Sequence, residues 1–457
     1  MRCNRRRPEV IHKERIKVLR GGPLSQGDYV LYWMQASQRA DYNHALEFAV
    51  RQANDAGLPL VVYFGISEKY PDSNTRNCRF MLEGLKQTAA KLKAQGINFV
   101  IRQESPEEGI VKLSSKAALT VFDTGYMPVQ KQWRGTAFQQ IKTPVVQVES
   151  DIIVPVETAS PKEEFAAYTI RPKITKLRDF FMQPLENHVV ECKNNLQLES
   201  LDISDPEKVI KSLHLDNSVT AAEKYHPGGA SEAQRRLKTF INDKLSSYAE
   251  MRNIPSEDFQ SGLSPYIHFG QISPLQIALE VNKTGLPDAK DFLEELIIRR
   301  ELAINFAHYN SSCQSYCSLP PWAIETLKEH RKDSREYLYS LDELEAGKTH
   351  DPCWNAAQQE MVVTGKMHGY MRMYWGKMIL LWSRTPEEGF KRALQLNDKY
   401  ELDGRDPNSC TGVAWCFGKH DRPWPSHPVL GKVRLMNQNG LKRKFDTNAY
   451  IAKIRDL

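Results

Sequence analysis

Apolar and polar positions follow two different rhythms along this chain. In the first third, short runs rich in Val, Ile, Tyr and Phe alternate with amphipathic segments of helical period. The runs cover residues 29–34, 59–65, 98–102, 119–124 and 145–148, and the helical segments include 41–56 and 78–95. This alternation is typical of βαβ units, so it predicts an α/β domain with a doubly wound parallel sheet over residues 26–155.

The rest of the chain is predicted to be mostly helical. Residues 156–225 lose the strand rhythm and carry four prolines, which indicates an interdomain linker with short helical pieces. From residue 226 to 457 helical periodicity dominates, which predicts an all-α domain that becomes rich in loops over 403–455. Its predicted helices cover 230–247, 274–282, 290–307, 321–333, 340–346, 356–364, 365–382 and 386–397. Residues 1–25 are predicted to form a basic tail.

The helix predicted over residues 365–382 has an unusual apolar face. Aromatic and sulfur-containing residues recur there at the spacing of one buried helix face. They are Met367, Tyr370, Met371, Tyr374, Trp375, Met378, Leu381 and Trp382. Periodicity alone favours core packing for these side chains. His368 and Arg372 lie on or near the same face, which leaves a binding site as the alternative.

Composition narrows the class of protein. The chain has 457 residues, of which 41% are apolar and 26% charged, as in globular proteins of two to three domains. Its eight cysteines show no C-x-x-C spacing, so we expect neither a disulfide framework nor a metal site. No transmembrane run or secretion signal is present. We therefore expect a reducing compartment: cytoplasm or nucleoid in a prokaryote, the nucleus in a eukaryote.

Charge and motifs exclude further classes. The net charge of +6 permits a local basic face for an anionic partner without requiring one. The chain lacks G-x-G-x-x-G, the phosphate loop G-x-x-x-x-G-K-[ST] and H-E-x-x-H. Dehydrogenase, nucleotide-hydrolysing and metalloprotease chemistry therefore have no support in the sequence.

Polar residues within the helical domain have two interpretations. Glu295 and Arg299 share a helix at i, i+4, which fits either a surface ion pair or the edge of a cavity where a carboxylate meets a ligand. Further along, Trp415 and Trp424 flank the basic segment 418–422. Aromatic residues interleaved with Lys and Arg are suited to stacking on nucleobases and contacting phosphates.

Several motifs, in order, resemble those of class II cyclobutane pyrimidine dimer photolyases. They are LSPYIHFGQIS at 263–273, ELIIRREL at 295–302, KTHDPCWN at 348–355, GKMHGYMRMYW at 365–375 and YELDGRDP at 400–407. The segments YVLYWM at 29–34 and AAYTIRP at 166–172 resemble the same family, and the likeness runs from about residue 15 to the end. It implies a light-driven DNA repair enzyme, a carbon-carbon lyase that uses reduced FAD to split pyrimidine dimers flipped out of DNA.

The resemblance also implies roles for individual residues. The residues implied to bind FAD are Tyr248, Leu263, Ser264, Arg300, Arg372, Asp403 and Asn397, the last beside the flavin N5. Glu295 is implied to hydrogen-bond the dimer, with Met373 and Trp415 packed on it. Trp382, Trp375 and Trp354 match a chain of aromatics that passes electrons to oxidised FAD. The residues implied to contact DNA are Arg252, Arg299, Arg405, Lys419, Arg422, Trp424, Lys442 and Arg443.

Two other functions stay open at this stage. A cryptochrome-like blue-light receptor would use the same flavin and tryptophans without repair, and a nucleic-acid-binding module would have no flavin at all. The family often uses a deazaflavin as a light-harvesting antenna, although no short motif here identifies one. We expect a monomer whose partner is UV-damaged DNA and which has no membrane association.

Overall fold

A six-stranded sheet forms the N-terminal domain of the protein. The computed structural model describes residues 11–192 and 196–457. The strands are β1 (Ile16–Arg20), β2 (Tyr29–Trp33), β3 (Leu60–Ile66), β4 (Asn98–Gln103), β5 (Ala117–Asp123) and β6 (Val145–Val148). Their order is β1-β6-β5-β2-β3-β4, and all pairs are parallel except β1 with β6.

Helices cover both faces of this sheet. One apolar layer joins α1 (His44–Ala56) and α2 (Thr75–Ala94) to the strands. A second layer, on the other face, joins α3 (Pro106–Ser114) and α4 (Pro128–Gln140). The strands of such a sheet are buried on both sides, as every residue of β2 and β5 is. The prediction of a doubly wound α/β domain is confirmed.

Strand β1 lies inside the segment predicted to be a tail. The tail was expected to extend to residue 25, but Ile16–Arg20 pairs with β6 at the edge of the sheet. Just before it, Arg15 is buried and donates to the carbonyls of Ile152 (2.8 Å) and Ile153 (2.6 Å). An edge strand with exposed basic residues has no continuous apolar run, so the hydrophobic pattern does not reveal it.

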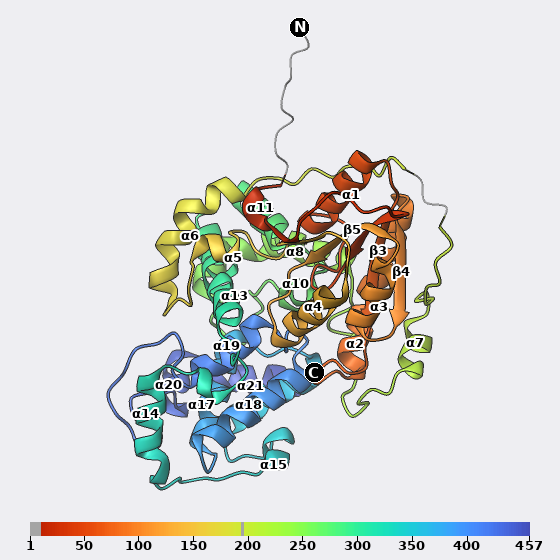
Figure 1. The fold of residues 1–457 in the computed structure, drawn as a ribbon. Helices are drawn as coiled ribbons and strands as arrows, with labels where there is room; N and C mark the ends of the chain where they lie inside the picture. Colours follow the sequence, from red (N-terminus) through yellow and green to blue (C-terminus); the bar gives the residue numbers. More distant parts are fainter. Residues whose placement is uncertain (1–10, 193–195) are drawn as a thin grey trace.

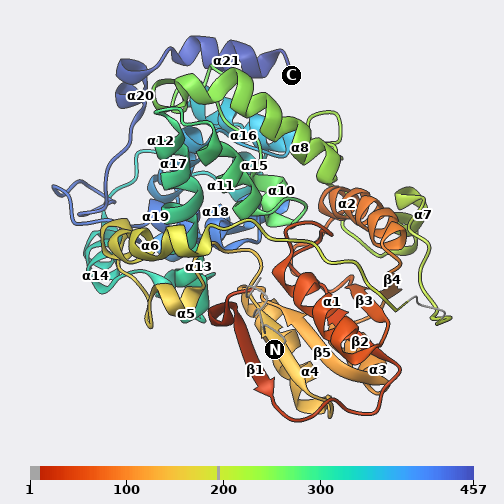
Figure 2. The same ribbon diagram turned by 90° about the horizontal axis from the view of Figure 1, so that it is seen from above.

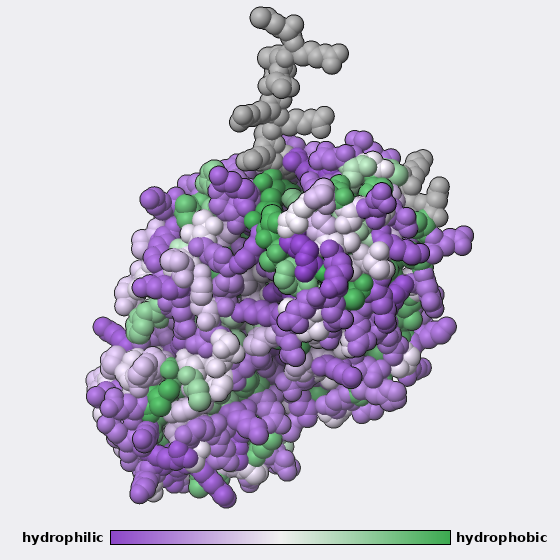
Figure 3. All heavy atoms as spheres, viewed as in Figure 1, coloured by the Kyte–Doolittle hydropathy of each residue, from purple (hydrophilic) through white to green (hydrophobic). Residues whose placement is uncertain are grey.

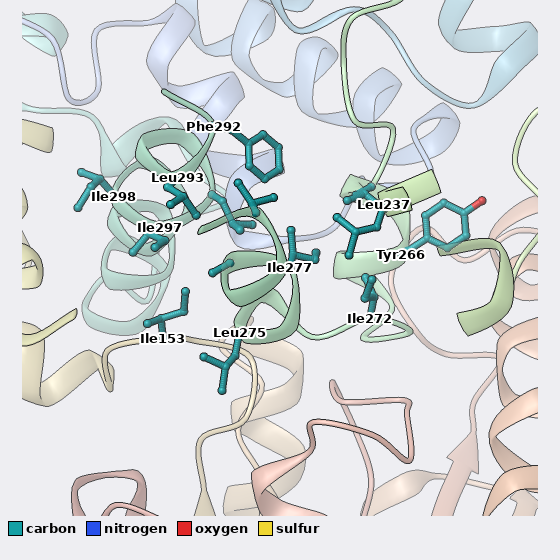
Figure 4. Packing of buried hydrophobic residues seen from close by; sticks show 14 of the residues in the cluster. Ile153, Leu237, Tyr266, Ile272, Leu275, Ile277, Phe292, Leu293, Ile297 and Ile298 are labelled. Carbon is teal, nitrogen blue, oxygen red and sulfur yellow. The ribbon is translucent and has the colours of Figure 1, made fainter. Parts of the chain in front are cut away.

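The segment expected to be a linker is shared between the two domains. It contains α5 (Val156–Ala159), α6 (Ala167–Phe181) and α7 (Pro206–Ser212). Apolar residues of α5 and α6 join the largest helical core, part of which is shown in Figure 4. Helix α7 instead packs on α2 beside the sheet. The described parts of the connection therefore pack against both domains.

Helices build the remainder of the protein. They are α8 (Ala230–Thr239), α9 (Tyr248–Met251), α10 (Ser264–His268), α11 (Pro274–Lys283), α12 (Ala289–Leu293), α13 (Arg300–Tyr309), α14 (Pro321–Glu329), α15 (Leu341–Glu345), α16 (Pro352–Thr364), α17 (Gly369–Leu381), α18 (Pro386–Tyr400), α19 (Pro407–Cys416), α20 (Gln438–Lys444) and α21 (Thr447–Arg455). Two π-helical segments, Phe240–Lys244 and Glu294–Arg299, and short 3-10 turns, Lys13–Arg15, Leu245–Ser247, Tyr316–Ser318 and His330–Lys332, complete the list.

The last part of the chain is more helical than predicted. Residues 403–455 were expected to be rich in loops, yet they contain α19, α20 and α21. Helix α19 is buried on nearly all sides, so it lacks the polar face that gives an amphipathic pattern. Helices α20 and α21 span only seven and nine residues, which is short for a periodic signal.

The two domains lie side by side, as Figures 1 and 2 show. A buried arginine forms hydrogen bonds between them. Arg76 of α2 donates to backbone carbonyls of the helical side: Thr220 (2.7 Å), Val362 (2.5 Å) and Tyr400 (2.8 Å). Burial lowers the pKa of its guanidinium to about 10, so it stays charged at neutral pH. A cation that donates to several carbonyls at once fixes the relative position of the two domains.

The surface shows no single apolar region on the face in Figure 3, where apolar residues form small groups among hydrophilic ones. Among the helices of residues 11–192 and 196–457, none is both long enough and apolar enough to cross a membrane.

Candidate active site

A pocket in the helical domain gathers residues predicted to act on a ligand. It has a volume of about 410 Å³. Its lining includes Tyr248, Arg252, Glu295, Tyr370, Met373, Lys377 and Trp415. These residues come from α9 and its C-cap, the π-helical segment, α17 and α19, which are far apart in the sequence. A wall of Met and Trp with a few polar groups is suited to a flat, mostly apolar ligand.

Glu295 stands in the π-helical segment Glu294–Arg299. The wider turn breaks the i, i+4 geometry, and the ion pair with Arg299 that the sequence allowed does not form. Glu295 pairs with Arg252 (2.8 Å), while Arg299 lies 5.3 Å from the Trp415 ring and 3.7 Å from Glu294. Single π-turns are frequent at functional sites, and this one presents a carboxylate to the pocket.

Arg372 lies at the centre of a buried charge cluster. Its guanidinium bridges Glu401 (2.7 Å) and Asp403 (2.9 Å), and Lys366 also reaches Asp403 (3.0 Å). Lys366 further donates to Ser264 (2.6 Å), which ties the 263–264 turn to the cluster. The pairing of Arg372 with Asp403 predicted from the sequence is present. Lys366 and Glu401 lie within the motifs at 365–375 and 400–407 but were assigned no role, because the sequence does not show which side chains of the two motifs meet.

The pKa values of the two carboxylates in this cluster are shifted in opposite directions. Arg372 and Lys366 hold the pKa of Asp403 well below its usual range despite burial. Burial raises the pKa of Glu401 to about 8, although Arg372 opposes the shift. The neighbouring carboxylates raise the pKa of Arg372, which is charged at all relevant pH. The cluster thus places two cations beside one carboxylate that stays charged and a second whose charge burial disfavours, which favours an anionic ligand.

Asn397 is oriented by its neighbours on α18 and α19. Its amide nitrogen donates to Asp398 (3.0 Å) and Ser409 (2.6 Å), and Ser409 in turn donates to Asp398 (2.8 Å). Both N–H groups are thus engaged, which leaves the amide oxygen as an acceptor. Asp398 and Ser409 were not singled out in the sequence, since they look like ordinary helix and cap residues.

Three buried tryptophans form a continuous row. Trp375 and Trp354 are stacked with centroids 6.3 Å apart, and Trp354 meets Trp382 edge-on at 5.5 Å. Hydrogen bonds from Trp375 to Gln358 (2.8 Å) and from Trp354 to the carbonyl of Trp375 (3.1 Å) fix the first two rings. The sequence brought these residues together as a set, but only the structure shows that Trp354 lies between the other two.

Two residues predicted to contact DNA are enclosed instead. Arg405 is 4% exposed and donates to the carbonyls of Asp72 and Asp398, and Lys419 is 7% exposed and pairs with Glu163. Neither can reach a phosphate without giving up these bonds, so both predictions are wrong. Their neighbourhood in the sequence, rich in Gly, Asp and Pro, looked like an exposed loop.

The other predicted DNA contacts lie nearer the surface. Arg422 and Arg434 both stack on the ring of Trp424, at 5.2 and 5.0 Å, and Arg434 also lines the pocket. Lys442 and Arg443 are exposed on α20.

Arg300, which the resemblance implied to bind FAD, lies between the two domains. It donates to the carbonyl of Asp151 (2.7 Å) and lines a smaller cavity there.

A second cavity, of about 110 Å³, lies where the sheet meets the helical domain. Aromatic and sulfur-containing residues line it, among them Trp33, Phe64, Tyr70, Met81 and Trp133. Asp123, at the end of β5, accepts from the backbone N–H groups of Gln35 (3.0 Å) and Ser37 (2.8 Å) after β2. The cavity therefore adjoins the carboxyl ends of the strands, the usual ligand side of such a sheet.

Comparisons with known sequences agree on one family. Residues 30–190 match the family described as DNA photolyase. The chain is 49% identical to the deoxyribodipyrimidine photo-lyase of Methanothermobacter thermautotrophicus, over 98% of this chain and 99% of that protein. It is 39% identical to the deoxyribodipyrimidine photo-lyase of Potorous tridactylus, over 94% and 82%.

Solved structures share the fold at low sequence identity. The class III photolyase of Agrobacterium tumefaciens matches with a TM-score of 0.73 and 18% identity, over 95% of this chain and 87% of that one. The archaeal photolyase of Sulfolobus tokodaii, solved with two FAD molecules, matches at 0.71 and 16%, over 93% and 89%. The Synechocystis cryptochrome matches at 0.73 and 14%, over 93% and 88%.

Proposed function

The chain belongs to the deoxyribodipyrimidine photo-lyase family, and from this premise we propose which of its residues perform light-driven DNA repair. The enzyme is a lyase that splits cyclobutane pyrimidine dimers in UV-damaged DNA. The observation that carries the proposed assignment is the pocket in which Glu295, Met373 and Trp415 meet beside the Arg372 cluster.

We propose that FAD binds at the Arg372 cluster and Asn397 and is active in its reduced form. The residues fit such a group, since the buried Arg372 Nε has no hydrogen-bond partner among the described residues and the Asn397 oxygen is a remaining acceptor. When bound, FAD supplies the light absorption and the electron that open the cyclobutane ring. The two cations of the cluster favour negative charge on the cofactor, and Asn397 can accept a hydrogen bond from a ring N–H.

The pocket residues act on the lesion in this proposal. Met373 and Trp415 pack on the two pyrimidines, and Glu295 hydrogen-bonds them while its pair with Arg252 keeps it in place. A dimer stacks poorly in duplex DNA, so flipping it into the pocket costs less than flipping normal bases. Arg422, Trp424, Lys442 and Arg443 hold the surrounding strand through phosphate and stacking contacts that read no sequence.

We further propose that the aromatic cavity beside the sheet holds an antenna chromophore of the deazaflavin type. Its aromatic lining and its place at the carboxyl ends of the strands support this. The antenna proposal is tested by producing the protein in a host that makes a deazaflavin. Bound chromophore should add an absorption band to the purified protein, and the Trp133→Ala variant should lack that band.

We expect the protein to be a monomer of 52.4 kDa, and light scattering measures its mass in solution.

The cryptochrome alternative has less support. The fold does not discriminate, since the cryptochrome and the class III photolyase match with the same TM-score. Sequence does, because relatives named photo-lyase align over nearly the whole chain at 49% and 39% identity.

Repair can be tested directly. Reduced holoprotein is incubated with an oligonucleotide containing one thymine dimer, in blue light and in the dark. Restored thymines are expected in the illuminated sample alone. A flavin-loaded, reduced protein that restores none would refute the repair function, and a protein purified without any flavin absorption would support the nucleic-acid-binding module instead.

A further inference from the structure

Lys377 is a buried lysine that the roles above leave unused. It follows Met373 by one turn of α17 and lines the same pocket as Glu295 and Trp415. The residue is 2% exposed, and its Nζ has no hydrogen-bond partner among the described residues. Lys419, the other lysine buried in the described part of the chain, pairs with Glu163 and with the carbonyl of Ser318.

Among the described residues, no neighbouring group accepts a hydrogen bond from the Lys377 ammonium. Cys416 of α19 faces it, and burial raises the pKa of that thiol to about 11, so it is neutral. Asp421 lines the same pocket, and one of its oxygens accepts from the Arg422 N–H (2.8 Å) and the Trp424 indole (3.2 Å). Arg434, also nearby, is a second cation. Burial lowers the pKa of the Lys377 ammonium to about 8.

Such a group points to a ligand that enters the pocket. A buried ammonium without a partner is strongly unfavourable, so proteins keep one where a bound molecule completes its hydrogen bonds. The neighbouring walls are Met373, Trp415 and Tyr370, which suit a planar base better than a phosphate. Because Lys377 is almost fully enclosed, only the part of a ligand that is inserted between these walls can touch it.

We propose that Lys377 is a catalytic residue whose ammonium donates a hydrogen bond to a carbonyl oxygen of the bound pyrimidine dimer. This proposal rests on the proposed function. The positive charge stabilises the dimer while it carries the extra electron, whereas the Glu295 carboxylate accepts a separate hydrogen bond from the dimer. Lys377 keeps its proton throughout: no bond to it forms or breaks, and the electron that enters the dimer leaves it again.

The test separates yield from binding. Lys377→Met and Lys377→Arg are compared with Lys391→Met, an exposed lysine of α18 outside the pocket. The assay measures dimers split per absorbed photon by reduced holoprotein at saturating dimer oligonucleotide, and dissociation constants are measured in the dark. Lys377→Met is expected to lower the yield about tenfold, the effect of losing one charged hydrogen bond. Lys377→Arg should retain most of the yield, and Lys391→Met all of it.

A pH series distinguishes charge from packing. The wild-type yield should fall as the pH rises through the ammonium's pKa, at or above about 8 because a bound acceptor favours the charged form. Lys377→Arg, which stays charged, should show no such fall, because its guanidinium does not titrate in this range.

The outcomes are decisive for Lys377. A Lys377→Met protein with the wild-type yield and pH profile would overturn the proposal. If Lys377→Met does not load flavin, the test is the pH series of wild type and Lys377→Arg. A Lys377→Arg protein whose yield falls with pH as the wild-type yield does would also overturn the proposal. A wild-type protein that repairs nothing refutes the proposed function itself, which is a different result from a variant that equals an active wild type.

Discussion

At the scale of single residues, burial and pairing assign different tasks to similar side chains. Glu295, Glu401 and Asp403 are all carboxylates of the helical domain, but Asp403 is held charged by two cations while burial favours the proton on Glu401. Glu295 is 39% exposed at its side chain and pairs with one arginine at the pocket. Its partial exposure leaves a carboxylate oxygen accessible to a ligand while the pair with Arg252 is kept.

Replacing Glu295 tests its proposed contact with the dimer. Glu295→Ala should lower the splitting yield per photon about tenfold, since a charged hydrogen bond to the electron-bearing dimer is lost. Binding in the dark should be largely kept, because Met373 and Trp415 still pack on the lesion. Glu294→Ala is the matched control: the adjacent carboxylate pairs with Arg171 (2.6 Å) outside the pocket and should leave the yield unchanged. Equal yields for both variants would rule out the role of Glu295.

At the scale of elements, α17 is the helix on which the site depends. Helix α16 ends at Gly365, whose φ of 78° a residue with a Cβ would rarely adopt, and α17 begins at the N-cap His368. Different faces of α17 then present Arg372 to the charge cluster, Met373 and Lys377 to the pocket and Trp375 to the tryptophan row. A shift of this one helix would disturb all three.

The tryptophan row predicts a separation of two activities. Trp382 lies at the end of the row opposite Trp375. Its ring meets Trp354 edge-on, and Trp354 separates it from Trp375. Trp382→Phe should block the light-induced bleaching of oxidised flavin, because phenylalanine is not oxidised as readily as an indole. Repair by protein reduced beforehand with dithionite should be unchanged. Trp322→Phe, outside the row, should alter neither, and loss of repair in the reduced Trp382→Phe protein would contradict the assignment.

The N-cap of α17 predicts a dependence of stability on pH. Burial, with help from Lys453 and Lys366, lowers the pKa of His368 to about 4. The unfolded chain binds this proton near 6.5 and the folded protein only near 4, so acid below about pH 6.5 favours unfolding. His368→Asn keeps an acceptor for the Tyr370 N–H and removes the titration.

The expected effect is a smaller loss of stability in acid. Between pH 7 and about pH 5 the variant should lose up to about 2 kcal/mol less than wild type, measured by thermal unfolding at each pH. His214→Asn, whose side chain is 94% exposed, is the control and should follow wild type. An identical pH dependence in wild type and His368→Asn would show that the buried imidazole does not titrate on unfolding.

At the scale of the whole molecule, modest net charge is combined with local basic residues. The chain carries only +6, so binding to DNA depends on where cations lie rather than on their number. The exposed Arg422, Lys442 and Arg443 follow α19 in the sequence, whereas Arg405 and Lys419 serve the interior.

The salt dependence of DNA binding reports how many of these cations contact phosphates. Removing Lys442 and Arg443 together by alanine should reduce the slope of log K against log salt by about 0.9 for each cation lost, and weaken binding equally for all sequences. Alanine at Lys208 and Lys211 of α7, both exposed, is the control for a general change in charge. An unchanged slope in the α20 variant would place the DNA elsewhere on the surface.

The sequence predicted the elements well where the pattern was strong. Strands β2 to β6 and helix α1 are found within a few residues of their predicted bounds, because buried parallel strands and amphipathic helices have distinct periods. Strand β1 and helix α19 were missed for opposite reasons. One is an exposed edge, and the other is enclosed on nearly all sides, so neither alternates between apolar and polar in a readable way.

What the sequence by itself determined is the fold class and the set of residues in the motifs, since local pattern and residue type are carried by the chain alone. Only the tertiary structure decided which of them meet. It placed Trp354 between Trp375 and Trp382, joined Lys366 and Glu401 to the Arg372 cluster, and enclosed Arg405 and Lys419. It also left the Lys377 ammonium in the pocket without a hydrogen-bond partner among the described residues. Burial and pairing set the charge and reach of a side chain, and both depend on residues distant in the sequence.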